Sequence, residues 1–485
     1  MILHIARREL LHNMMNLRFS LVTILLLALM TANGFIYTKS WQKGSIEEYN
    51  SKISKARKGL QERCVELAEL GKRGPGRMYR RPGMLNFMSN RYGDSIPDVV
   101  WCGSGTTWNR SSISEMWYLV YSPVTDRYAR TSGEASDLMP RAISLDWAFI
   151  MGTLLSLTAI IFTFDSISGE KERGTLSLVM SNSVSRSTVL LGKTLGAWIT
   201  LMIPLVLGVL ANLLVILLLG NRSFQSGDWH RITVALAISI VYGSVFLMLG
   251  IFVSSLSSRS STSIFTLLLI WVITVVLLPS ALGTVSRKLK PMPPLDAVRQ
   301  NKQALLESMR DKHRSALRGD GTWPAEGAGS NEWLSNWAGY ITELADEETK
   351  FNNKHVDKQI AQVELAMDIC RISPVSVYQY ALESMACEGI PRYRDFIHQV
   401  RIYARQFADF IRSTDKQDKE SHHIYFVGEG MSQKPVSFDS VPKFQDTHRW
   451  DVDLGNAMLD IALLCIQFIA LFMCAYVAFL RMDIA

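Results

Sequence analysis

The tripeptide Gly192-Lys193-Thr194 comes closer than any other stretch to a nucleotide-binding motif. In a phosphate-binding loop, an earlier glycine lets backbone N–H groups wrap the phosphates, and the loop follows a strand. Ser187 occupies the position of that glycine here, and no strand precedes it. We therefore predict that this chain binds no ATP itself.

The histidines do not form a metal-binding pattern. None makes an HExxH pair, and His422 and His423 are adjacent, which suits a metal poorly without other ligands nearby. No arrangement of a nucleophile with a base is visible either. The sequence predicts no catalytic residue, no metal site and no cofactor bound by this chain.

Four cysteines fall in two long polar segments of the chain. If those segments lie in an oxidising compartment, disulfides are possible there. Pairing within each segment would join Cys64 to Cys102 and Cys370 to Cys387. Free thiols are the equally favoured alternative. Two more cysteines, Cys465 and Cys474, lie in an apolar run and are interpreted as packing residues.

Six apolar runs separate and flank these polar segments. Each is long enough to cross a hydrocarbon core about 30 Å thick as a helix, and lipid leaves no backbone group unpaired. The sequence predicts a mainly α polytopic membrane protein with mixed α/β and helical-hairpin domains outside the membrane. The predicted spans are Phe19–Tyr37, Trp147–Phe164, Gly196–Leu219, Ile232–Val253, Ser263–Leu282 and Asn456–Leu480.

Basic residues set the expected orientation. Arg7, Arg8 and Arg18 precede the first span against Glu9 alone, and Arg481 follows the last span. The excess of Lys and Arg on the cytoplasmic side of membrane proteins then predicts that both termini are cytoplasmic. We expect a bacterial inner (cytoplasmic) membrane protein that contacts lipids and binds no nucleic acid.

These runs divide the chain into five parts. An amphipathic interfacial helix and the first span occupy residues 1–37, and the sixth span with a cytoplasmic tail occupies 456–485. The second to fifth spans occupy 147–282 and include a polar elbow at 165–195. Two extracytoplasmic insertions remain, one at 38–146 with helix and short strands, and one at 283–455 with a helical hairpin.

Within the insertions the sequence supports more detailed expectations. Ser45–Leu70 reads as a helix and Pro97–Tyr128 as short strands. The basic stretch Gly71–Gly83 is interpreted as a solvated loop, or alternatively as a contact with lipid head groups or an anionic ligand. The second insertion is expected to hold helices at Asp296–Leu317, Glu332–Cys370, Val375–Met385 and Tyr393–Ser413, a turn at Glu388–Pro391 and a solvated linker at Thr414–Glu420.

Polar residues inside the spans are candidates for a transport pathway, because ionisable and polar groups are costly in lipid. Gln467 lies deepest, and Asp460 lies nearer the end of the same span. Gly192 and Gly196 form a pair with small-residue spacing that would permit close helix contact.

The elbow carries a family resemblance. Its run SGEKERGTLSLVMSNSVSRSTVLLGKTLG (168–196) resembles the cytoplasmic signature of type-2 ABC exporter permeases. One departure is Met180-Ser181-Asn182-Ser183, where the family more often has Leu-Ser-x-Pro. The chain further resembles a subgroup with large insertions after the first and fifth spans. The matching residues are Gly169, Glu170, Glu172, Arg173, Gly174, Thr175, Leu176, Ser185, Arg186, Leu191, Gly192 and Lys193.

The resemblance implies the permease subunit of an ATP-driven exporter. Two permeases, as a homodimer or heterodimer, would bind two copies of a separate ATPase that carries the ATP and Mg. The coupling residues would be Gly169, Glu170, Glu172, Arg173, Gly174, Thr175 and Arg186, with the charges of Glu170, Glu172 and Arg173 offered to the ATPase. The alternative is a non-transporting assembly subunit whose outer domains act mechanically on an extracytoplasmic partner.

Overall fold

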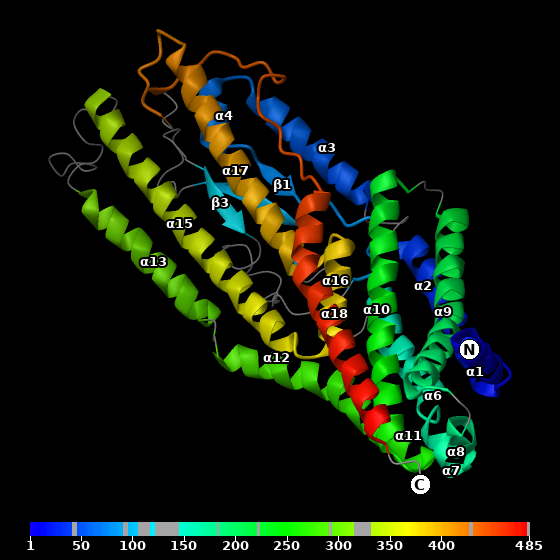
Figure 1. Ribbon diagram of the computed structural model, residues 1–485. Helices are drawn as coiled ribbons and strands as arrows, with labels where there is room; N and C mark the ends of the chain where they lie inside the picture. The colour runs from blue at the N-terminus through cyan, green and yellow to red at the C-terminus, as the bar shows by residue number, and fades with distance from the viewer. Residues whose placement is uncertain are drawn as a thin grey trace.

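The computed structural model describes the chain except for residues 41–45, 91–95, 105–116, 122–144, 182–183, 221–223, 290, 292, 315–330, 426–429 and 483–485. The described part consists mostly of helices, with one three-stranded sheet (Figure 1). Parts of the expected strand segment Pro97–Tyr128, and Asn182 and Ser183 of the elbow, fall outside it.

Within the described residues, six helical segments are long and apolar enough to cross a membrane, as predicted from the apolar runs. Two of them are interrupted by π-helical turns, η4 and η5. The six comprise α2 (Leu17–Ser40); α5 (Trp147–Ile150), η4 (Met151–Leu155) and α6 (Ser156–Thr163); α9 (Arg186–Leu219); α10 (Ser226–Leu256); α11 (Ser260–Trp271), η5 (Val272–Leu277) and α12 (Leu278–Leu289); and α18 (Trp450–Arg481).

The second and fourth spans form the interior of the bundle. Their most apolar windows are 72% and 67% buried, whereas those of the fifth and sixth spans are only 11% and 17% buried. The π-helical turn η4 contributes to this interior, because the Tyr242 hydroxyl of α10 donates to the Gly152 carbonyl at 2.6 Å. The fifth and sixth spans therefore present most of their apolar surface outward.

The amphipathic helix α1 (Ile2–Met14) packs directly on α9. A Cβ added at Gly192 would lie 2.7 Å from the Ile5 Cβ, and one at Gly196 would lie 2.6 Å from the Glu9 Cβ. Only glycine permits this approach. The prediction of a close helix contact at these two glycines is confirmed.

The first insertion contains α3 (Ile46–Arg63), α4 (Leu67–Arg73) and three antiparallel strands. The order is β1 (Arg77–Tyr79), β2 (Val99–Ser104) and β3 (Trp117–Tyr121), with Met78 opposite Val100 and Trp101 opposite Val120. The interpretation of the basic stretch as a solvated loop is wrong, because it supplies an edge strand. Arg80 is also buried there, with its guanidinium 3.1 Å from Glu388 of the second insertion.

A long helical hairpin begins the second insertion, as predicted. It consists of α13 (Leu295–Lys312) and α15 (Asn331–Cys370), which lie side by side in Figure 1. Lys302 lies 3.6 Å from Glu348, and Lys312 pairs with Glu343, so the two helices are antiparallel.

The next helix, α16 (Pro374–Met385), packs into the membrane bundle against α10 and α18 (Figure 1). Tyr378 stacks on Tyr242 with ring centroids 4.3 Å apart, and the Tyr378 and Ser239 hydroxyls lie 2.9 Å apart. The sequence predicted this helix but not its insertion between spans, because its composition is only moderately apolar.

The following helix, α17 (Gly389–Lys416), corrects two predictions. The expected turn at Glu388–Pro391 is its first turn, where proline is tolerated because the missing N–H would be unpaired anyway. The expected solvated linker is also wrong, because its first three residues are helical. Asp415 is buried and accepts a hydrogen bond from the Ser432 N–H at 2.8 Å.

The two insertions share one hydrophobic core. It joins apolar residues of α3, α4 and the sheet to α15 and α17, so neither insertion buries its apolar surface alone. Representative members are Leu60, Leu70, Val100, Val356, Phe396 and Phe407.

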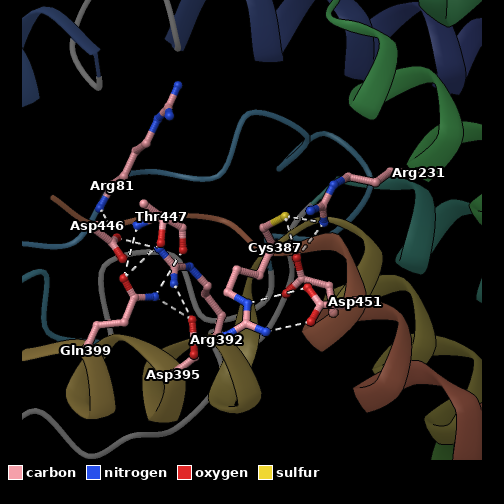
Figure 2. Close-up of polar contacts among 11 residues, drawn as sticks. Arg81, Arg231, Cys387, Arg392, Asp395, Gln399, Asp446, Thr447 and Asp451 are labelled. Carbon is pink, nitrogen blue, oxygen red and sulfur yellow. Dashed lines mark hydrogen bonds and ion pairs between the residues drawn. The ribbon is translucent and has the colours of Figure 1, made fainter. Parts of the chain in front are cut away.

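A polar joint connects the two insertions to each other (Figure 2). Arg392 of α17 pairs with Asp446 and, at 3.1 Å, with Asp395; Asp446 also accepts from the Arg81 N–H at 2.6 Å. Burial and the neighbouring arginines, Arg392 first, lower the pKa of His448 to about 2. The joint therefore holds this histidine neutral at any physiological pH.

The structure contains Cys64, Cys102, Cys370 and Cys387 as free thiols, so neither expected disulfide is formed. Cys370 ends α15, and Cys387 follows α16. The intervening helix of 12 residues rises about 18 Å, far beyond the reach of a disulfide. The Cys387 thiol lies instead against Arg231 and Asp453.

Candidate functional site

The elbow folds as two short helices, α7 (Ser168–Glu172) and α8 (Thr175–Met180), at the end of the bundle where the chain terminates (Figure 1). Gly174 separates them with φ +68°, a conformation that favours glycine. A Cβ at Gly174 would meet nothing within 4 Å. The glycine is therefore required for the bend and not for close approach to another part of this chain.

Lys193 of α9 is the centre of the contacts beneath the elbow. Its side chain is only 3% exposed. The ammonium lies 2.5 Å from Glu9 Oε1 and 2.9 Å from Glu170 Oε1, and it donates to the Ser166 carbonyl at 2.9 Å. One buried cation thus joins α1, α7 and α9.

Glu170 is therefore directed toward the bundle, where the resemblance implied a charge offered to a partner. The neighbouring Gly169 is buried, and its carbonyl accepts a hydrogen bond from Arg173 Nε at 2.9 Å. The carboxylate of Glu170 and the backbone of Gly169 position the elbow and are not part of its exposed surface.

Two further contacts attach α7 to the α10–α11 connection. The Glu172 carboxylate accepts from the Ser260 N–H at 3.0 Å, and Lys171 Nζ donates to the Ser255 carbonyl at 2.5 Å. The Ser254 hydroxyl of α10 accepts from the N–H groups of Ile167 and Ser168 at 3.1 and 3.0 Å. The elbow is therefore attached both to α10 and to the start of α11.

Beyond Glu172, which is itself exposed, the elbow presents Arg173, Gly174, Thr175, Ser177 and Leu178, which we call the docking face. All five are exposed, and Leu178 is 68% exposed although it is apolar. An exposed leucine between polar residues on a rigidly held helix provides both hydrophobic and polar contacts. Such a surface suits the binding of a protein partner.

Arg186 begins α9 and reaches across to the end of α18. Its Nη1 donates to the carbonyls of Leu480 at 2.6 Å and Met482 at 2.9 Å. Helix C-termini leave their last carbonyls without intrahelical partners, so this arginine caps the sixth span. Arg186 is thereby an internal link between the elbow and the last span.

The two polar residues of α18 differ in their surroundings. Asp460 is 1% exposed and pairs with Arg371, whose Nε lies 2.6 Å from Oδ1. Gln467 is partly buried, and its Oε1 has no hydrogen-bond partner among the described residues. Asp460 thus joins α18 to the end of α15, whereas a pathway role for Gln467 stays a prediction.

The sequence missed Lys193 and Glu9 as site residues. Lys193 was recognised only as part of the signature. A lysine at the start of a membrane span is energetically costly unless it is paired, so its presence could have indicated a nearby acidic partner. Glu9, the sole acid of the basic leader, was the candidate partner.

These features define a polytopic α-helical membrane protein with a polar elbow fixed to one end of its bundle and a separate exposed docking face. The family model "ABC-2 family transporter protein" matches residues 3–484, and the chain belongs to that family.

A relative also matches part of the chain. The "Probable ABC transporter permease protein NosY" of Pseudomonas aeruginosa is 33% identical over 132 residues, which are 27% of this chain and 47% of that protein. The alignment therefore spans about half of the relative's length.

Proposed function

We propose that this chain is the permease subunit of an ATP-driven ABC exporter, and that a separate ATPase subunit binds its docking face. The observation that carries the proposal is the division of the elbow into two surfaces. Glu170 and Glu172 hold it to the bundle, while the five residues of the docking face remain exposed. Membership of the transporter family supports the same assignment.

The contacts of the elbow suit it to transmit motion. A displacement of α7 acts directly on α1 and α9 through Lys193, and on the start of α11 through Glu172. Arg186 extends the connection to α18. ATP and Mg would reside on the ATPase, whose closure would move several spans together.

The complete transporter would contain two permeases and two ATPase subunits in a bacterial inner membrane. The outward-facing apolar surface of the fifth span offers area for a second permease. The docking face, both termini and the α10–α11 connection would lie in the cytoplasm. The family match favours this transport role over the mechanical assembly role.

The test uses one apolar residue of the docking face and a matched residue elsewhere. Leu178 and Val65 are 68% and 66% exposed, and Val65 lies in the first insertion. The tagged chain is purified from its native membrane, and bound ATPase is measured by mass spectrometry. Leu178→Asp should lower ATPase recovery by about tenfold or more, because a charge is then buried in the contact.

Val65→Asp should leave ATPase recovery at the wild-type level. Equal recovery with both variants would refute the docking face. Recovery of wild-type chain without any ATPase subunit would refute the permease assignment itself.

A further inference from the structure

A groove of about 720 Å³ opens between the ends of α10 and α18, beside the elbow. Most of the residues that line it are apolar, and some of them are exposed on the outside of the bundle. Leu256 is 64% exposed and Met473 is 52% exposed. The lining residues also include two cations, Lys171 and Arg481, and no described carboxylate. We call this feature the basic groove.

The two cations have donors to offer. Lys171 is fixed by the carbonyls of Ser255 and Ser257, at 2.5 and 3.3 Å, which leaves one of its three N–H donors. Arg481 is exposed, and its guanidinium makes no hydrogen bond or ion pair within the part of the chain that the structure describes. Both side chains lie at the polar end of a membrane-facing groove.

The helix ends that frame the groove would ordinarily repel an anion. The C-terminus of a helix carries a partial negative charge on its free carbonyls. Here Lys171 covers the end of α10, and Arg186 covers the carbonyls of Leu480 and Met482 at the end of α18. These cations neutralise the negative C-terminal ends of the two helices, so the electrostatic potential in the groove is positive.

We propose that the basic groove binds an anionic phospholipid. The phosphate lies between Lys171 and Arg481, and an acyl chain follows the apolar wall formed by Leu256, Met473 and Val477. Basic pockets between spans are suited to such head groups. The bound lipid contacts the elbow and two spans at once.

Other occupants match the groove less well. Free phosphate would leave the exposed apolar walls uncovered. A second copy of this chain would bring further bases to the same end of the bundle, and burying like charges without carboxylates is unfavourable. The combination of a positive mouth with an apolar wall open toward the bilayer selects a lipid.

The test counts bound lipid directly. The full chain is reconstituted in phosphatidylcholine nanodiscs with and without phosphatidylglycerol, and retained lipid is measured by native mass spectrometry. We expect wild-type chain to retain phosphatidylglycerol and Lys171→Gln/Arg481→Gln to lose it by about tenfold or more. Arg7→Gln/Arg8→Gln, which removes the same charge from exposed positions of α1, should retain it.

Two further variants separate the parts of the site. Arg481→Gln alone alters only an exposed side chain and should lower retention measurably even if the double variant folds poorly. Ala478→Trp keeps both cations but fills the groove, and it should also lose the lipid.

Three results would overturn the proposal. The first is equal retention by wild type and Lys171→Gln/Arg481→Gln. The second is an equal loss in Arg7→Gln/Arg8→Gln, which would indicate general attraction to the membrane surface. The third is displacement of phosphatidylglycerol by inorganic phosphate with no effect of Ala478→Trp, which would assign the cations to a free anion.

Discussion

At the scale of single residues, the elbow depends on the charge of Lys193. Its ammonium lies between two carboxylates, Glu9 and Glu170, and all three are largely removed from water. Removing one member of a buried ionic group leaves its partners uncompensated, which costs more than the intact group contributes. These three residues therefore fix the position of the elbow more than they add to the net stability of the fold.

Lys193→Met should lower the free energy of unfolding by about 3 to 5 kcal/mol, because two carboxylates then face each other without a cation. Thermal unfolding of the detergent-purified chain measures the effect. The triple variant Glu9→Gln/Glu170→Gln/Lys193→Met should recover most of the loss. A triple variant no more stable than Lys193→Met would contradict the assigned network.

His448 predicts a pH dependence at the polar joint. The unfolded chain protonates this residue below about pH 6.5, whereas the folded chain holds its pKa at about 2. The unfolded state therefore binds the extra proton, and stability falls as pH is lowered from 6.5, by at most about 1.4 kcal/mol per pH unit. The contribution does not change above pH 6.5.

Melting temperatures measured from pH 7.5 to about pH 5 check this sign. His448→Gln should flatten the slope in the acidic range, and His422→Gln, an exposed control, should not. Identical slopes in wild type and His448→Gln would show that this histidine makes no such contribution.

At the scale of elements, α1 approaches α9 closely at Gly196. Gly196→Leu should destabilise the chain by at least about 1 to 3 kcal/mol, because its Cβ would overlap Glu9 and the Ala6 carbonyl. Gly227→Leu, where a Cβ meets nothing within 4 Å, is the control and should be nearly neutral. The two melting temperatures should differ in that order, and the reverse order would contradict the packing of α1.

Elements were predictable from sequence where the cause is local. Six spans follow from run length, and α13 and α15 follow from helical spacing, so both predictions succeeded. The strand β1 did not follow, because its pairing with β2 is non-local. The insertion of α16 into the bundle depends on the fit of Tyr378 against Tyr242 and could not be read from its own residues.

The candidate site was predictable to a similar extent. The signature identified the elbow and named Arg173, Gly174 and Thr175, which the structure exposes. It could not indicate that Glu170 turns inward, because Glu9 and Lys193 are separated by 184 residues in the chain. A signature records which residue types are needed but not which way they point.

At the scale of the whole molecule, the chain connects its two ends through continuous contacts. The two insertions share one core, and α16, which contacts α17 of that core, packs on α10 and α18. At the opposite end of the same spans, Lys171 and Arg186 attach the elbow to α10 and α18. A displacement of the elbow therefore has a packed route to the insertions.

The central claim is that the docking face binds a cytoplasmic ATPase. The most direct measurement places a photoreactive amino acid at Leu178 or, as the matched position, at Val65 of the full chain in its native membrane. Irradiation should yield an adduct with an ATP-binding cassette ATPase at Leu178 and none at Val65. An absence of this adduct at Leu178, or the same adduct at both positions, would contradict the account.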